Sequence, residues 1–429
     1  MLFKKKNEAA LTPPMGWNSW DCFAANVTED ELLANARALK ENLADFGYKY
    51  VVCDIQWSDP LAGSEKGVVY RDFAKLAIDE YGRQIPAEER FPSSAGGVGF
   101  KKISDEIHAM GLKFGIHIMR GIPRRAVELD CPVKGTEVTA RAVADPFSIC
   151  PWNGDMYGVK NTPEGQAYYD SIFELYASWG VDFVKVDDIA HEHQHPDRAY
   201  GEAEVHMTRK AIDNSGRSMV LSLSPGPAVI EKAWPMERDA NMWRITDDFW
   251  DDWKLLYAMF ERCEVWQRHV GPGSWPDCDM LPLGRIGTGF GAGRDTNFTK
   301  DEQRTLMNLW CIFRSPLIMG GDLREIDDFT LSLLTNKDVL DADQNGKNPT
   351  ELVRDEDHVI WTSEAPGKGR YLAIFNISTC EKALEFDLSA LDMNITGARE
   401  LWEGSEPDIR SGKLSVKLAS HASAMYLIS

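Results

Sequence analysis

The chain lacks an excess of basic charge. Its 429 residues include 47 Lys and Arg against 67 Asp and Glu, which gives a formal net charge of −20 at pH 7. Nucleic acids and anionic membranes are bound through clustered positive charge, so this balance argues against both kinds of partner. The composition favours a neutral small molecule as the partner, and it leaves the oligomeric state open.

Long apolar runs are also missing. No stretch reaches the roughly 20 uninterrupted apolar residues that a membrane-spanning helix needs. The basic residues Lys4, Lys5 and Lys6 are not followed by an apolar run of signal-peptide length. We therefore expect a cytoplasmic protein.

Paired cysteine motifs are absent as well. The eight cysteines are scattered, with no CxxC pair and no zinc-type spacing. They are Cys22, Cys53, Cys131, Cys150, Cys263, Cys278, Cys311 and Cys380. In a reducing compartment such cysteines are mostly free, buried thiols. No GxGxxG motif follows an expected strand, which argues against a dinucleotide-binding domain.

What the first 345 residues do contain is an alternation of short β-rich runs and helical patterns. Strands are expected at 50–55, 112–118, 181–186, 218–224 and 241–245, and helices at 28–45, 100–110, from 162, and at 301–313 and 327–334. Thr28 followed by Glu31 is a capping-box pattern, and Pro163 suits a first helical position. Repeated βα units in a chain of this length favour an α/β fold of the (β/α)8 TIM barrel type over an open sheet.

The character of the chain changes from about residue 350. Short β-rich runs at 359–362, 371–376, 414–418 and 424–428 are separated by turn-forming Gly, Pro, Asn and Asp. This spacing predicts a C-terminal antiparallel β-sandwich. We place the division at residues 1–345 for the barrel and 346–429 for the sandwich.

One expected strand ends in charged residues of opposite sign. The run 180–188 places Lys185 and Asp187 two residues apart, so both side chains lie on one face of the strand. A cation beside a carboxylate at the end of a buried strand keeps the carboxylate ionised. Asp187 is therefore a candidate catalytic carboxylate.

A second acidic cluster follows another expected strand, at 241–245. It contains Arg244, Asp247 and Asp248. Hydrolysis of a glycosidic bond by double displacement needs two carboxyl groups in different environments, about 5 Å apart, and these two clusters can supply them. We assign the second role to Asp248 and expect Asp247 to be the N-cap of a helix at 249–260.

Several motifs, in order along the whole chain, resemble those of glycoside hydrolase family 27, the α-galactosidase and α-N-acetylgalactosaminidase (melibiase) family. They are Pro-Pro-Met-Gly-Trp-Asn-Ser-Trp at 13–20, Asp-Glu-Tyr-Gly-Arg at 79–83, Arg-Phe-Pro at 90–92, Lys-Phe-Gly-Ile at 113–116, Gly-Pro-Gly-Ser-Trp-Pro-Asp-Cys-Asp-Met-Leu at 271–281 and Asp-Leu-Arg at 322–324. The resemblance implies a (β/α)8 barrel with a C-terminal β-sandwich and a retaining mechanism without metal or other cofactor.

The resemblance also assigns roles to particular residues. Asp187 resembles the nucleophile and Asp248 the acid/base. The remaining matched positions are substrate-binding: Trp20 on the apolar face of the sugar, Asp54 at its 4- and 6-hydroxyls, Lys185 at a hydroxyl, and Arg244 and Asp279 near its 2-position.

Three departures from the family pattern bear on specificity. Ile55 stands where a second Asp is usual after Asp54, so one hydroxyl contact is missing or supplied elsewhere. His117, which we include among the substrate-binding candidates, replaces a common tyrosine. Ser224 in the run 222–227 leaves room for an N-acetyl group, although Pro227 is not the usual partner. Separately, Asp188 and Ile189 stand directly after Asp187, where the family often has a cysteine that forms an active-site disulfide.

We therefore expect an exo-acting glycosidase that removes terminal α-D-galactose or α-N-acetyl-D-galactosamine, with β-L-arabinopyranosidase as a related alternative. Two other classes stay open. His191, His193 and His195 could make a metal-dependent barrel hydrolase with Asp54 and Asp187, although a solvated His-rich loop is the simpler interpretation. The loss of an acid at Ile55 would also suit an inactive sugar-binding protein.

Overall fold

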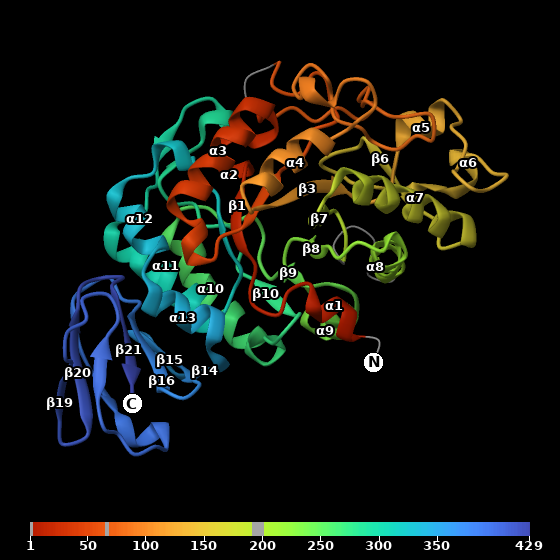
Figure 1. The fold of residues 1–429 in the computed structure, drawn as a ribbon. Helices are drawn as coiled ribbons and strands as arrows, with labels where there is room; N and C mark the ends of the chain where they lie inside the picture. Colours follow the sequence, from red (N-terminus) through yellow and green to blue (C-terminus); the bar gives the residue numbers. More distant parts are fainter. Residues whose placement is uncertain (1–2, 65–67, 191–200) are drawn as a thin grey trace.

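Eight parallel strands form the centre of the molecule. The computed structural model describes residues 3–64, 68–190 and 201–429 (Figure 1). Their order is β10-β9-β8-β7-β3-β2-β1-β13. The last and first members meet through Leu281, which follows β10: its amide donates to the Ile318 carbonyl (2.8 Å), and the Gly320 amide donates to the Leu281 carbonyl (3.0 Å). The sheet closes on itself, so the predicted barrel is confirmed.

The strands of the barrel are short and almost entirely buried. They are β1 Met15–Asn18, β2 Tyr50–Cys53, β3 Lys113–Met119, β7 Phe183–Asp187, β8 Val220–Ser224, β9 Met242–Arg244, β10 Trp275–Asp277 and β13 Leu317–Met319. Five of them coincide with runs expected from the sequence: β2, β8 and β9 fall within those runs, and β3 and β7 extend one residue beyond them. Parallel strands of a barrel are covered on both faces, which is why their side chains read as continuous apolar runs.

A helix follows each strand and covers the outside of the barrel. In the same order these are α3 Glu29–Asn42, α4 Lys101–Ala109, α7 Pro163–Trp179, α8 Glu202–Ser215, α9 Ala233–Asp239, α10 Trp253–Trp266 and α11 Lys300–Phe313, and after β13 come α12 Asp328–Leu334 and α13 Lys337–Asn345. Thr28 caps α3 and forms the predicted capping box with Glu31, and Thr162 caps α7 ahead of Pro163.

The predicted role of Asp247 as an N-cap is wrong. Helix α10 begins at Trp253, and its N-cap is Asp252, whose side chain accepts from the Lys254 amide (2.8 Å). Residues 245–252 form an extended loop instead. The sequence carries four Asp in this stretch, and each suits an N-cap, so composition alone did not identify the one that begins the helix.

Two small sheets extend the loops on the carboxyl side of the barrel. Between β3 and β7 the strands β4 Ile122–Pro123, β5 Ala144–Ile149 and β6 Met156–Val159 form one sheet, accompanied by α5 Arg124–Glu128 and α6 Ala140–Val143. Between β10 and β13, β11 Arg285–Ile286 pairs with β12 Arg294–Asp295. The short helices α1 Phe3–Glu8 and α2 Trp20–Phe23 complete the N-terminal part.

The remaining strands form two antiparallel sheets beside α11 and α13 (Figure 1). One contains β14 Lys347–Arg354, β15 His358–Ala365, β16 Gly369–Asn376, β21 Ser423–Ile428 and β18 Ala398–Glu400; the other contains β17 Lys382–Asp387, β20 Lys413–Leu418 and β19 Asp408–Arg410. Leu372, Ile374, Leu384, Phe386 and Leu414 pack between the sheets. This arrangement confirms the predicted β-sandwich.

The sandwich shares an apolar core with the barrel. Trp361 meets Phe313 of α11 edge-on, and Phe375 meets Phe260 of α10. The His421 ring stacks on Trp253 with centroids 3.6 Å apart. We infer that the sandwich supports the helices behind the site rather than acting alone.

Two further expectations concern the whole chain. Seven of the eight cysteines are buried free thiols, and Cys380 is exposed. Within the described ranges, none of the helices has the length and apolar character to cross a lipid bilayer.

Candidate active site

A pocket of about 740 Å³ opens where the strands of the barrel end, among the loops that follow them. All nine residues selected from the sequence line it: Trp20, Asp54, His117, Lys185, Asp187, Ser224, Arg244, Asp248 and Asp279. Seven of the barrel strands or their following loops supply these side chains. The carboxyl ends of the strands are where barrel enzymes carry their sites.

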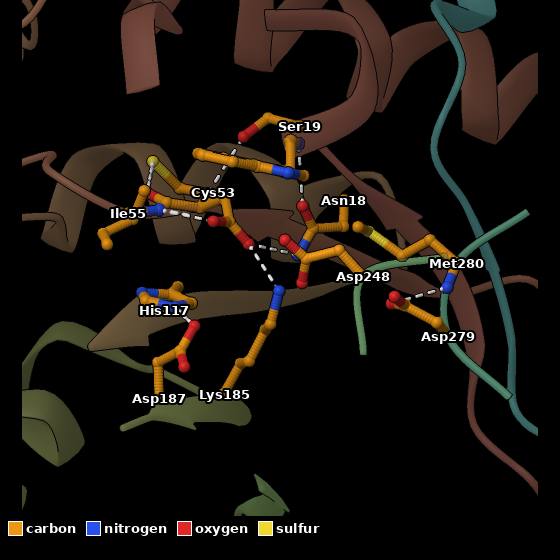
Figure 2. Close-up of polar contacts among 12 residues, drawn as sticks. Asn18, Ser19, Cys53, Ile55, His117, Lys185, Asp187, Asp248, Asp279 and Met280 are labelled. Atoms are coloured by element: carbon orange, nitrogen blue, oxygen red, sulfur yellow. Dashed lines mark hydrogen bonds and ion pairs between the residues drawn. The ribbon is translucent and has the colours of Figure 1, made fainter. Parts of the chain in front are cut away.

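Asp187 ends β7 and accepts two hydrogen bonds. Its Oδ2 atom lies 3.0 Å from His117 Nε2, and its Oδ1 atom accepts from the Asp188 amide at 2.7 Å. Figure 2 shows His117, Lys185 and Asp187 extending toward the same space. Burial favours the neutral acid, but the hydrogen bond from His117 and the charges of Arg244 and Lys185 outweigh it and lower the pKa of Asp187 below its usual value.

The backbone just after Asp187 is in the left-handed region. Asp188 has φ of +52°, which is costly for a residue with a side chain. Its carboxylate is fixed by Arg120 at 2.9 Å, and Arg120 is held in turn by Glu204 at 3.1 Å. This buried ion-pair chain holds the turn that follows Asp187 and so directs the carboxylate into the pocket.

Lys185 and Asp54 form the polar floor of the pocket. The ammonium lies 3.2 Å from Asp54 Oδ2, which also accepts from Asn18 Nδ2 at 2.8 Å, while Oδ1 accepts from the Ile55 amide at 2.8 Å. Asp54 is 2% exposed. Burial opposes its charge, yet Lys185 and these donors lower its pKa well below the usual range, so the carboxylate is a permanent acceptor for sugar hydroxyls.

Arg244 joins two further carboxylates on the opposite side. Its Nη1 atom donates to Asp248 Oδ1 at 2.7 Å and to Asp279 Oδ2 at 3.4 Å. Asp279 also accepts from the backbone amides of Phe249 and Met280, both at 2.9 Å. Burial raises the pKa of Asp279, while Arg244 and Lys185 act in the other direction.

The two candidate catalytic carboxyl groups therefore have different environments. The side chain of Asp187 is 18% exposed and surrounded by donors and cations, whereas that of Asp248 is 63% exposed with one ion pair to Arg244. Figure 2 shows both directed into the pocket. Two carboxyl groups with unlike surroundings, facing one cavity, can divide the tasks of nucleophile and proton donor.

One wall of the pocket is apolar where the family usually has an acid. Ile55 is 4% exposed and packs with Ala25, Met119 and Met156, with Trp20 and Tyr70 against the same cluster. A second wall carries Ser224, 2% exposed, whose hydroxyl has no hydrogen-bond partner among the described residues. The first wall suits a carbon atom of the ligand, and the second can still receive a polar group.

Sequence reasoning missed several residues of the pocket. Tyr70, Trp152 and Phe290 line it from loops whose sequences carry no catalytic pattern. Asp21 also lines it; it is 1% exposed, and burial among Asp279 and other acids raises its pKa well above the usual value. Its position directly after Trp20 was the one signal that could have drawn attention to it.

The His-rich segment is the alternative metal site left open by the sequence. His191, His193 and His195 lie outside the described residues. Within the described ranges no three His, Cys, Asp or Glu side chains are grouped so as to hold a metal ion.

Family models match two parts of the chain. A model described as Alpha galactosidase A matches residues 154–345, and one described as Alpha galactosidase C-terminal beta sandwich domain matches residues 355–428. These ranges contain Asp187 and Asp248 and most of the sandwich.

Three relatives are similar over almost the whole chain. The crystal structure of a β-L-arabinopyranosidase of glycoside hydrolase family 27 from Geobacillus stearothermophilus is 52% identical, covers 99% of this chain and 98% of its own, and has a TM-score of 0.94. A putative α-N-acetylgalactosaminidase from Bacillus halodurans is 50% identical, with coverage of 98% and 97% and a TM-score of 0.88. Alpha-galactosidase 2 of Arabidopsis thaliana is 27% identical over 98% of this chain and 90% of its own.

Proposed function

Because the chain belongs to glycoside hydrolase family 27, we propose that it is a retaining exo-glycosidase for terminal sugars of the galactose configuration, with β-L-arabinopyranosides as the best substrates. The observation that carries this proposal is the single pocket into which Asp187 and Asp248 both open from unlike surroundings. Binding a sugar there places its anomeric carbon between the two carboxyl groups.

The proposed reaction has two steps. In the first, an Asp187 oxygen attacks the anomeric carbon, the glycosidic C–O bond breaks, and Asp248 gives its proton to the leaving oxygen. In the second, the Asp248 carboxylate takes a proton from water, the water oxygen attacks the same carbon, and the ester bond to Asp187 breaks. The lowered pKa of Asp187 supports its role, because the attacking group must be ionised.

The preference for a pentose rests on Ile55. β-L-Arabinopyranose has the ring configuration of α-D-galactopyranose but carries hydrogen where galactose carries the hydroxymethyl group at C5. The apolar wall at Ile55, beside Asp54, offers the hydroxyl of this hydroxymethyl group no partner. Leaving a polar group unpaired in a buried site is costly, so galactose should bind less well. The β-L-arabinopyranosidase that is 52% identical has been solved, as a variant, with arabinose bound.

A second candidate substrate is a terminal α-N-acetyl-D-galactosaminide, which carries the larger N-acetyl group at its 2-position. Ser224 is small, and its hydroxyl is unpartnered among the described residues, which leaves room and a donor for an N-acetyl group. The α-N-acetylgalactosaminidase activity is therefore kept as the alternative, and the substrate panel below includes it.

The test is hydrolysis of three nitrophenyl glycosides: β-L-arabinopyranoside, α-D-galactopyranoside and α-N-acetyl-D-galactosaminide. We expect the first to have the highest kcat/KM, and the sugar released first, observed by proton NMR, to keep its anomeric configuration. Asp187→Asn should remove turnover, whereas Asp182→Asn, just before the other end of β7, should retain it. No turnover of any substrate, or release of the inverted anomer, contradicts the proposal.

A further inference from the structure

The solvent-facing rim of the pocket differs in character from its floor. Buried polar side chains such as Asp54, His117 and Asp279 form the floor. The lining residues that reach solvent are instead mostly aromatic or apolar: Val68, Tyr70, Trp152, Pro227, Trp250 and Phe290. We call these six residues the aromatic rim. Trp152 is 40% exposed and Phe290 38% exposed, so these large rings meet water when the pocket is empty.

The rings of the rim are held in two groups by contacts with each other. Tyr70 meets Trp152 edge-on, with centroids 5.2 Å apart. Phe290 meets Trp250 at 5.3 Å and Trp20 at 5.5 Å, both nearly perpendicular. Side chains that are already fixed lose little conformational entropy when a ligand arrives. Exposed aromatic rings gathered at the mouth of a site indicate a binding surface rather than scattered surface residues.

The position of the rim relates it to the leaving group. Asp248, the proposed proton donor, is the exposed member of the catalytic pair, and Trp250 follows it by two residues. The group that receives its proton must lie beside it, on the solvent side of the sugar. The volume of about 740 Å³ is within the range of pockets that enclose drug-sized ligands, so a single pentose leaves much of it unfilled.

Building on the proposed function, we propose that the aromatic rim is a leaving-group subsite for apolar, ring-containing alcohols, and that the natural substrates are glycosides of such alcohols rather than oligosaccharides. A sugar in this position would present several hydroxyls, and each needs a partner when it leaves water. Among the described lining residues that are not buried, the polar side chains are Tyr70, Lys185, Asp187, Asp247 and Asp248. Lys185 and Asp187 belong to the sugar site, so a leaving group would find the Tyr70 hydroxyl, two carboxylates and the indole N–H groups of Trp152 and Trp250. Two carboxylates there also disfavour an anionic leaving group.

Leaving-group chemistry and leaving-group binding can be separated experimentally. Benzyl alcohol and the primary hydroxyl of glucose have comparable acidity, so the two leaving groups depart with similar intrinsic ease. A difference in kcat/KM between their glycosides therefore reports the contacts that each leaving group makes with the aromatic rim. The enzyme is assayed with benzyl β-L-arabinopyranoside, with the disaccharide in which the same sugar is joined to the 6-hydroxyl of glucose, and with the methyl glycoside as a reference. We expect kcat/KM for the benzyl glycoside to exceed that for the disaccharide by roughly tenfold.

Variants assign the difference to the rim. Trp152→Ala should lower the ratio of kcat/KM for the benzyl glycoside to kcat/KM for the methyl glycoside by roughly five- to tenfold. Trp152→Phe should restore most of the loss. Phe147→Ala is the matched control, because Phe147 lies in β5, the strand before the loop that carries Trp152, and is 79% exposed but does not line the pocket.

The outcomes separate the two proposals. Equal or faster cleavage of the disaccharide, or a Trp152→Ala loss shared by all three substrates, overturns the apolar subsite and leaves the glycosidase intact. If none of the glycosides is cleaved, the proposed function fails. Calorimetric titration of the Asp187→Asn variant then still decides the subsite: the benzyl glycoside must bind more tightly than the methyl glycoside, and Trp152→Ala must remove the difference.

Discussion

His117 and Asp187 face each other across neighbouring barrel strands, with His117 Nε2 3.0 Å from Asp187 Oδ2. The imidazole is 1% exposed, and its Nδ1 atom has no partner among the described residues. In the register of β3 with β7, His117 is opposite Lys185, and Met119 is opposite Asp187. The ring therefore donates to the proposed nucleophile from one side, and the charges of Arg244, Lys185 and Asp54 lie nearby.

The first prediction concerns the pH dependence of catalysis. His117→Phe removes the donor that helps keep the pKa of Asp187 low, so the pKa of Asp187 should rise. Since the free enzyme needs Asp187 ionised, the acidic limb of kcat/KM should move to higher pH by about one unit or more. His117→Tyr, which supplies a hydroxyl donor, should keep the limb near its original position.

A matched control is the pair of His108 and Asp182, near the end of β7 that lies away from Asp187. His108 Nε2 lies 2.7 Å from Asp182 Oδ2, just before β7 begins. His108→Phe breaks a similar pair far from the pocket and should leave the pH profile unchanged. If His117→Phe lowers kcat/KM equally at every pH, then His117 serves only to fill space, and the assigned role is wrong.

The second prediction concerns the sugar that the pocket selects. Ile55→Asp replaces an apolar wall with an acceptor next to Asp54 and should raise the ratio of galactoside to arabinopyranoside kcat/KM by roughly 10- to 100-fold. Ile55→Val keeps the wall apolar and should leave the ratio within about threefold. Parallel kinetics on the two nitrophenyl glycosides give the ratio directly. A ratio that does not change in Ile55→Asp would mean that the C5 substituent does not face this residue.

The sequence was sufficient to predict the barrel and the polar residues at the centre of the pocket, but not all of the residues that form the walls of the pocket. Strands such as β7 were found because apolar β-branched residues run directly into charged ones. β1, β10 and β13 were not expected as strands, because each has only three or four residues, and β1 includes Gly and Asn and β10 includes Pro and Asp, which are depleted in strands. Tertiary pairing, not local preference, makes them strands.

The same distinction holds inside the site. Lys185 and Asp187 were predicted because a cation and a carboxylate share one face at the end of an apolar strand, and the family resemblance assigned the roles of Asp187 and Arg244. Tyr70 and Trp152 come from separate loops, between β2 and α4 and between β5 and β6, and meet only in the folded chain. An aromatic residue in a loop looks the same in sequence whether it covers the core or a ligand, so the aromatic rim required coordinates.

The third prediction separates Asp248 from its neighbour. Asp248→Asn should slow cleavage of the methyl glycoside by roughly 100-fold or more but affect a dinitrophenyl glycoside far less, because that leaving group needs no proton. Asp247→Asn is the matched control, since Asp247 is also exposed and lines the same pocket. It should leave both rates nearly unchanged. The opposite pattern would transfer the acid/base role to Asp247.

The fourth prediction concerns stability, at Asp277 below the pocket. Burial, with the nearby charge of Asp279, raises the pKa of Asp277 to about 7 in the folded protein. Below the ordinary pKa of the unfolded chain, both states hold the proton and the group has no effect. As the pH rises toward 7, only the unfolded state releases it, so the folded protein loses stability; above 7 the loss is constant at roughly 4 kcal/mol.

Asp277→Asn keeps the oxygen that accepts from the Asp279 amide (3.0 Å) and cannot ionise. The free energy of unfolding, measured with urea, should be equal for the variant and the parent at pH 4 and higher for the variant at pH 8. Asp408→Asn, at an exposed position, is the control and should show no such difference. A pH-independent effect of Asp277→Asn would mean that Asp277 is ionised in the folded protein.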